Sequence, residues 1–148
     1  MNEGTPEFQE RIAGVLAAAG FPRMPARVLM VLMVSEEGLT AAEIAERLDI
    51  SAAAVSGAVR YLQLIGYAAR IPVSGSRRDR YTIARAWYTA SMTNAAVYQQ
   101  VADAAAEGVA TLPAGSVAHT RVAEMGDFFA FIQERMGALL AEWDARRG

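Results

Sequence analysis

The sequence predicts a mainly α-helical protein of the α+β class, with one small β-hairpin and a long helical C-terminal part. Two short segments with helical periodicity, 41–49 and 51–66, are separated by only a few residues. Two β-compatible runs, 67–71 and 80–83, follow at once with proline and glycine between them. Near the C-terminus, apolar residues recur in steps of three and four, as in helices that pack lengthwise on other helices.

The two short helices should form a helix-turn-helix unit. Thr40 and Glu43 have the spacing of a capping box, which starts a helix at Ala41 and lets the Glu43 carboxylate reach back toward Thr40. Ser51 is a good N-cap for the second helix, and Gly66 should end it. Two helices joined by a turn of about three residues define the unit.

The second helix separates into two faces when it is wound at 3.6 residues per turn. One face is apolar and should be buried; the other carries small residues and one arginine, which suits close approach to another body. In a DNA major groove, Ser51 and Ser56 could bond phosphates or base edges, and Arg60 could reach guanine or a phosphate. The alternative is an ordinary helix hairpin with a bland surface. The apolar face comprises Val55, Ala58, Val59, Leu62 and Ile65, and the opposite face Ala53, Ser56, Gly57 and Arg60.

The order helix, turn, helix, hairpin is that of a winged helix, with residues 72–79 as the wing loop. Residues 60–85 contain six arginines and one acid, a local charge of 6 − 1 = +5 in a chain whose net charge is −2. A basic tip beside a recognition helix favours phosphate contact over a merely solvated loop. Asp79 is interpreted as an orienting partner of Arg77 or Arg80. The candidate DNA-binding residues are Thr40, Ser51, Ala52, Ala53, Ser56, Gly57, Arg60, Arg77, Arg78 and Arg80.

These segments resemble the MarR superfamily of bacterial repressors over roughly residues 20–83, through 20–23, 26–29, 39–45, 51–60 and 75–81. Phe21-Pro22-Arg23 and Tyr81 most resemble the GbsR-like branch. The resemblance implies a sequence-specific DNA-binding regulator, a repressor, that is released by a small effector. One departure is the run 52–54, three alanines where such regulators often carry bulkier or more polar residues. The alternative is a winged helix that binds protein and not DNA.

Composition bounds the class of protein. The chain has 148 residues, 53% hydrophobic and 20% charged, which is typical of a folded domain and excludes default disorder. All fourteen basic residues are arginine, which we attribute to genomic composition. A net charge of −2 argues against a general nucleic-acid coat but permits a local basic face. Cysteine is absent, which excludes disulfides and thiolate chemistry. No signal peptide or membrane span is apparent, so we expect a cytoplasmic protein.

The N-terminal part should hold two helices. Thr5 should begin the first, which Gly20 ends. A second helix over 26–34 is apolar all round and should be the buried spine of the DNA-binding domain. Arg23 and Arg27 near its start could contact DNA, bridge to the wing or simply be exposed.

The C-terminal part should be two long helices, 84–108 and a last helix capped by Ser116. The apolar seam of the last helix is Val122, Met125, Phe129, Ile132, Met136, Leu139 and Trp143. Covering it needs a second copy of the chain, so we expect a homodimer with Met125, Phe129, Ile132, Met136, Leu139 and Trp143 at the interface. The expected domains are 1–20 (dimerisation), 21–84 (winged helix-turn-helix) and 85–148 (dimerisation stalk).

Sites of other chemistry are not indicated. His119 is the sole histidine and has no cysteine or second histidine with which to share a metal. No nucleophile motif, phosphate loop or catalytic carboxylate pair stands out, so neither an enzyme nor a cofactor is expected. The family resemblance makes the junction after the wing a candidate pocket for a small apolar or aromatic effector, lined by Trp87, Tyr88, Met92 and Tyr98. Core packing is the alternative for these four residues.

Overall fold

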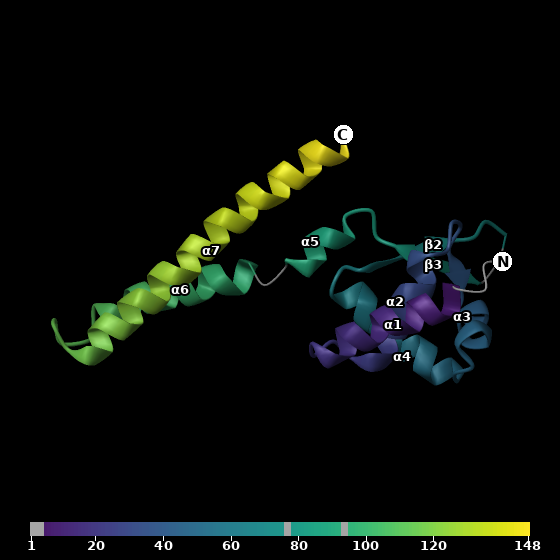
Figure 1. Ribbon diagram of the computed structural model, residues 1–148, viewed down its shortest axis with the longest axis horizontal. Helices are drawn as coiled ribbons and strands as arrows, with labels where there is room; N and C mark the ends of the chain where they lie inside the picture. Colours follow the sequence, from purple (N-terminus) through teal and green to yellow (C-terminus); the bar gives the residue numbers. More distant parts are fainter. Residues whose placement is uncertain (1–4, 76–77, 93–94) are drawn as a thin grey trace. The chain divides into compact units, whose positions relative to one another are not determined.

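The computed structural model describes residues 5–75, 78–92 and 95–148, which fold as two compact units, Met1–Ala90 and Ser91–Gly148. The described part is mainly helical with a small antiparallel sheet, so the predicted fold class is confirmed (Figure 1). The elements in chain order are α1 (Thr5–Ala18), α2 (Arg23–Met33), β1 (Leu39–Thr40), α3 (Ala41–Leu48), α4 (Ala52–Leu64), β2 (Ala68–Pro72), β3 (Asp79–Ile83), α5 (Trp87–Ser91), α6 (Ala95–Val109) and α7 (Val117–Arg147).

Helices α3 and α4 form the predicted helix-turn-helix. The Thr40 hydroxyl accepts from the Glu43 amide at 3.2 Å, and the Ser51 hydroxyl accepts from the Ala54 amide at 3.1 Å. Asp49, with φ of 52°, closes α3 in the left-handed conformation and turns the chain toward α4. The reciprocal half of the expected capping box is absent from these contacts, because the Glu43 carboxylate accepts from Arg80 instead.

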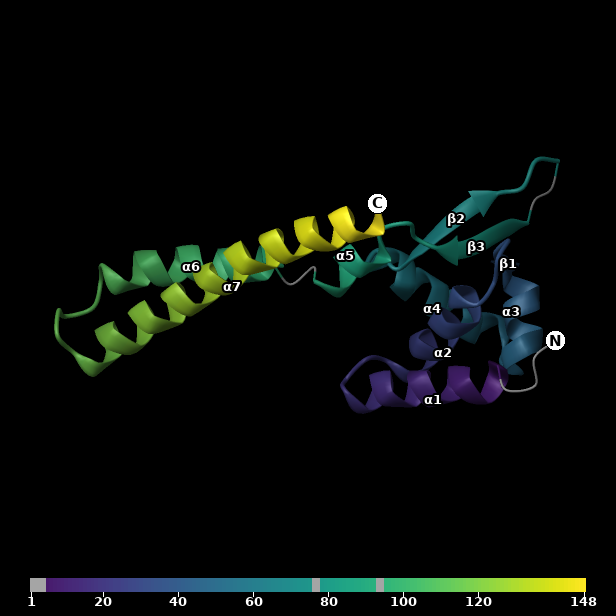
Figure 2. The same ribbon diagram turned by 45° about the horizontal axis from the view of Figure 1, so that its top comes forward.

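The predicted hairpin is a wing of two antiparallel strands, to which the structure adds a third. Strand β3 lies between β2 and β1, with Arg70 opposite Tyr81 on one side and Leu39 opposite Tyr81 on the other. Figure 2 shows the β2–β3 hairpin projecting beside α3 and α4. Strand β1 was not predicted, because a two-residue strand has no periodicity and exists only through its pairing with β3.

Helix α2 is the centre of the first unit, as its apolar composition predicts. Its residues 28–32 are at most 5% exposed. All of them except Met30 pack with Ile44 of α3 and with Val55 and Leu62 of α4, and Met30 packs with Ala13 of α1. The helix begins at Arg23, three residues before the predicted start. Pro25 is tolerated there because amides in a first turn need no intrahelical acceptor.

Two residues at the edges of α2 attach neighbouring elements to it. Phe21 packs edge-on against Tyr61 and Tyr67, with ring centroids 5.8 Å apart in both pairs. Arg27 donates from Nε to Glu10 of α1 at 2.9 Å and also to the Leu48 carbonyl at 3.4 Å. Arg27 therefore links α1, α2 and the end of α3. It is a structural residue of the unit rather than a bridge to the wing.

The second unit is a helical hairpin of α6 and α7, which lie side by side (Figure 1). Ser116 caps α7 as predicted, accepting from the His119 amide at 3.1 Å. Gly126 permits close packing, because a Cβ there would lie 3.0 Å from the Ala105 Cβ. The single helix predicted over 84–108 is wrong: residues 84–86 are not helical, and α5 and α6 are separate helices, with Met92 in a turn and 93–94 outside the described residues.

Gly38 offers a sharp test of the contact between β1 and the wing. It has φ of +80°, and a Cβ would lie 2.7 Å from the Tyr81 carbonyl oxygen. We expect Gly38→Ala to lower the free energy of unfolding by about 2 kcal/mol, through backbone strain and this clash. Denaturant unfolding followed by circular dichroism measures it. The matched control is Gly14→Ala in α1, where no atom lies within 4 Å and helix propensity should raise stability by about 0.5–1 kcal/mol. Equal stability of the two variants would contradict this account of Gly38.

Candidate nucleic-acid interface

The outward face of α4 consists of small side chains near its start, followed by the longer polar side chains of Arg60 and Gln63. Ala53, Ser56, Gly57 and Arg60 are exposed, whereas Val55, Ala58, Val59 and Leu62 on the opposite side are at most 3% exposed. Ile65, expected on the buried face, is half-buried. No side chain on the exposed face is bulky before Arg60, so this part of the helix backbone can approach another surface closely.

The helix caps keep donors available at the same surface. The oxygens of Thr40 and Ser51 each accept a backbone amide, which leaves the hydroxyl hydrogen of each residue for a further acceptor. Ser51, Ala52 and Ala53 are exposed at the start of α4, and Thr40 is half-buried at the start of α3. Both helix N-termini also carry the partial positive charge that favours phosphate.

A crevice of about 200 Å³ separates α4 from the wing. Ser56 and Arg60 line it from α4, together with Gln63 and with Tyr81 of β3. Gln63 and Tyr81 are absent from the predicted site. Gln63 was recognisable, since it lies three residues after Arg60 and seven after Ser56 on the same helical face. Tyr81 comes to the site only through the register of the sheet.

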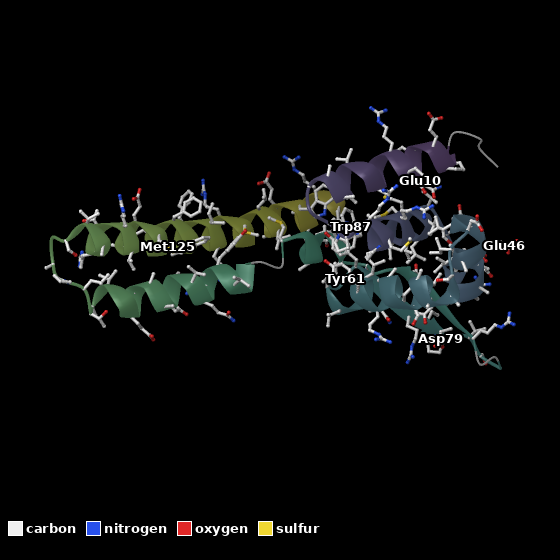
Figure 3. The ribbon with its side chains drawn as sticks, turned by 90° about the horizontal axis from the view of Figure 1, so that it is seen from below. Glu10, Glu46, Tyr61, Asp79, Trp87 and Met125 are labelled. Atoms are coloured by element: carbon white, nitrogen blue, oxygen red, sulfur yellow. The ribbon has the colours of Figure 1, made fainter. Side chains whose placement is uncertain are left out.

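A second groove, of about 430 Å³, lies between the wing and α3. It is lined by Arg78 and Arg80 but also by Glu43 and Glu46, so folding places acidic groups beside the wing arginines. Arg78 is exposed. Arg77, the other predicted tip residue, lies outside the described residues. Figure 3 labels Glu46 on α3 and Asp79 on the hairpin.

Arg70 and Arg80, which belong to the six arginines counted in 60–85, pair with carboxylates of the protein. Arg80 donates to the Gly38 carbonyl at 2.9 Å and to Glu43 at 3.5 Å. Asp79 lies 3.5 Å from Arg70, a partner that differs from the expected Arg77 or Arg80. Because the sequence window omits Glu43, its net of +5 overstates the charge that the wing presents. Arg60, Arg70, Arg78 and Arg85 are exposed, whereas Arg80 is half-buried.

The apolar seam of α7 has two environments in the second unit: one part packs on α6, and the other part is exposed. Phe129 packs on Tyr98 of α6, with ring centroids 5.3 Å apart, and Val122 is half-buried near α6. Ile132 and Met136 are half-buried. Met125, labelled on α7 in Figure 3, is 48% exposed, and Leu139 and Trp143 are 55% and 45% exposed. Phe128 and Phe131 are also more than half exposed, so α7 carries a broad apolar surface that its own unit leaves open.

The residues of the predicted effector pocket have partners of their own. Trp87 meets Tyr88 edge-on within α5, at 6.1 Å between ring centroids. Tyr98 belongs to the second unit and stacks on Phe129, and Met92 is half-buried in a turn. Core packing, the alternative to an effector pocket, therefore explains the position of Tyr98. An effector site at these residues stays a prediction.

The described residues show neither a metal site nor a membrane-spanning helix. No group of three His, Asp or Glu side chains there is arranged to hold a metal ion, and His119 is half-buried after the α7 cap. No helix among the described residues is both long and apolar enough to cross a bilayer.

The arrangement of helix-turn-helix and wing defines a winged-helix protein. Sequence comparison then identifies the family of its parts: residues 19–79 match a MarR-family profile, and residues 85–146 match the profile of MmpR5-like MarR-family transcriptional regulators. The chain therefore contains MarR-family winged-helix regulator domains and has the fold of a MarR-family transcriptional regulator. The predicted superfamily is confirmed, as is the expectation that the chain is not an enzyme. No curated protein matches the chain in sequence.

Solved structures support the fold. A crystal structure described only as a transcriptional regulator has a TM-score of 0.80 and 23% identity, covering 95% of this chain and 98% of that one. More distant is MepR, a transcription regulator of the Staphylococcus aureus multidrug efflux pump MepA, with a TM-score of 0.45, 17% identity and coverage of 96% and 91%. An S. aureus MepR–DNA complex has a TM-score of 0.45, 16% identity and coverage of 95% and 90%. At such TM-scores nothing about this chain follows from MepR.

Proposed function

We propose that the protein is a homodimeric, sequence-specific DNA-binding regulator that represses transcription in the bacterial cytoplasm. The observation that carries the proposal is the exposed α4 face of small residues and Arg60, next to a wing bearing exposed Arg78, in a MarR-family fold. A helix with so little side-chain bulk fits into a major groove, whose width admits one helix.

The proposed DNA contacts are of two kinds: contacts to phosphates, which position the protein, and contacts to base edges, which read the sequence. Ser51 and Thr40 hydroxyls and the helix N-termini would hold phosphates, which fixes the register of the protein on the duplex. Ser56 and Arg60 would face base edges, and Ala52, Ala53 and Gly57 would allow the approach. Arg77 and Arg78 would meet phosphate or the narrow minor groove of A·T-rich DNA. With one arginine as the main reader, affinity would depend strongly on phosphate contacts and DNA shape.

The homodimer is proposed from the apolar surface of α7. Isolated exposed apolar residues need no explanation, but Met125, Phe128, Leu139 and Trp143 form a continuous stripe along one helix. Such a surface in a charged, folded protein marks an interaction site, and a heptad seam fits a second copy of the same helix. Phe8 of α1, 52% exposed, is a further apolar group for this interface.

A protein-interaction module without DNA binding is the second candidate. The three alanines at 52–54 favour it, since they offer no hydrogen bonds to base edges. The exposed arginines of α4 and the wing favour DNA. Salt dependence distinguishes the two, because release of counterions from phosphates gives DNA binding a steep slope.

The branch of the family to which the chain belongs and its regulation by a small effector are also proposals. Phe21-Pro22-Arg23 and Tyr81 resemble the GbsR-like branch, whereas residues 85–146 match the MmpR5-like profile. An apolar or aromatic effector that binds near Trp87 would release DNA only as far as it binds the DNA-incompatible conformation more tightly.

DNA binding is tested by a salt titration of affinity on two duplexes, one selected from a random pool by the wild-type protein and one unselected. We expect Arg78→Ala to weaken binding to both duplexes alike and to reduce the salt slope by about one per protomer. We expect Arg60→Ala to cost about 1–3 kcal/mol on the selected duplex only, because it reads a base.

Arg146→Ala is the matched control, since Arg146 is an exposed arginine of the second unit that pairs with Glu142. It changes the net charge equally and should leave both slopes unchanged. If wild-type binding showed no salt dependence on either duplex, the protein-interaction module would become the favoured function.

The dimer is tested by placing a charge in the α7 seam. Ile132→Glu should shift the protein to monomer at micromolar concentration, because a carboxylate buried in an apolar interface lacks a partner. Ala138→Glu introduces the same charge about 120° away around the helix, outside the seam, and should leave the dimer intact. Sedimentation velocity or light scattering reads the mass. A wild-type protein that is monomeric under these conditions would contradict the proposal.

The effector is tested by Trp87 fluorescence. Trp143 is the only other tryptophan, so a Trp143→Phe protein reports Trp87 alone. Apolar and aromatic metabolites that release DNA should change this emission in a saturable manner. A compound that releases DNA without altering the emission would place the effector site elsewhere.

A further inference from the structure

We propose that Arg80 is a positioning residue, which fixes the wing relative to the helix-turn-helix rather than contacting DNA. The inference rests on the proposed DNA-binding function and concerns how its interface is held together. It reassigns an arginine that the sequence pattern places among the phosphate contacts.

The geometry ties three separate segments to one guanidinium. Arg80 is a residue of wing strand β3, and its backbone lies opposite Thr40 of β1. One terminal nitrogen donates to the Gly38 carbonyl at 2.9 Å, in the turn before α3. The other lies 3.5 Å from the Glu43 carboxylate in the first turn of α3. One side chain therefore contacts the wing, the turn and the helix start, in addition to the backbone pairing of β3 with β1.

The acceptors leave the guanidinium little freedom. Arginine donors point in fixed directions within one plane, so two acceptors determine that plane. The Gly38 carbonyl is held in place because the next residue, Leu39, pairs with Tyr81 of β3. Glu43 is held at the other end, because its own amide caps α3 through Thr40. Both acceptors belong to parts of the chain that are already ordered.

The charges near Arg80 favour its pairing with Glu43 over a contact with a DNA phosphate. Glu43 and Glu46 line the same groove as Arg78, on the side of the wing that would face DNA. If Arg80 turned toward a phosphate, the Glu43 carboxylate would lose its partner and repel the same phosphate. Pairing Arg80 with Glu43 reduces that repulsion.

The other ion pair of the wing cannot replace this link. Arg70 and Asp79 lie 3.5 Å apart on the two strands of the hairpin, so they stabilise the hairpin itself. They do not fix its position relative to α3. The distance between Arg78 and Arg60, and therefore the simultaneous fit of wing and α4 to one duplex, would depend on Arg80.

The experiment compares Arg80→Ala with Arg78→Ala on the selected and unselected duplexes at several salt concentrations, below the melting transition of every variant. We expect Arg80→Ala to weaken binding about tenfold with an unchanged salt slope, because a positioning loss removes no counterion contact. Arg80→Lys should recover part of the affinity, since an ammonium can reach one acceptor but not hold the plane. Glu43→Gln should cost less in the Arg80→Ala protein than in wild type, because the two residues act together.

Amide hydrogen exchange supplies a readout that needs no DNA. Arg80→Ala should accelerate exchange in 38–43 and 79–83 while the thermal transition stays close to wild type. The control Arg146→Ala, in the second unit, should leave exchange in both segments unchanged. A salt slope that falls by about one per protomer in Arg80→Ala would show a direct phosphate contact and overturn the proposal. Unchanged exchange in both segments would overturn it equally. If the wild-type protein binds neither duplex, the proposed function fails, and exchange alone decides whether Arg80 fixes the wing.

Discussion

The burial of α2 is the constraint on which the first unit depends. A helix that is apolar on every side must be covered on every side, and α1, α3, α4 and the sheet supply the cover. Helix α4 takes part through Val55, Val59 and Leu62, so its opposite face must point outward. The surface proposed to read DNA is therefore a consequence of how the core is closed. Its small side chains are tolerated there because the stability of α4 comes from the buried side.

Arginines serve two purposes in this protein, and charge counting alone does not separate them. Arg27 joins α1, α2 and α3, and Arg80 joins the wing to the start of α3. Each meets both a carboxylate and a backbone carbonyl, which favours a forked donor over an ammonium. Arg60 and Arg78 instead stand exposed on the helix and the wing. The sequence window around the wing counts all its arginines as equal, because the acid that pairs with Arg80, Glu43, lies 37 residues earlier in the chain.

Local chemistry explains which elements could be predicted. Caps at Thr40, Ser51 and Ser116 fixed three helix starts, since such signals act over a few residues. Features that depend on distant partners were missed: β1 exists only through β3, and Tyr81 reaches the interface only through sheet register. The helix predicted across 84–108 failed for a related reason. Periodic alanines and aromatics allowed one continuous helix, and nothing local in the sequence indicated that α5 and α6 are separate.

The last helix shows how one seam can serve two partners. Near Val122 and Phe129 the seam faces α6, which covers it through Tyr98 and neighbouring alanines. Helix α6 has 15 residues and α7 has 31, so α6 does not extend along the part of α7 that holds Leu139 and Trp143, and these residues are about half exposed. The apolar repeat of α7 thus continues past the end of α6. This surface supports the proposed homodimer, in which two copies of α4 would belong to one molecule.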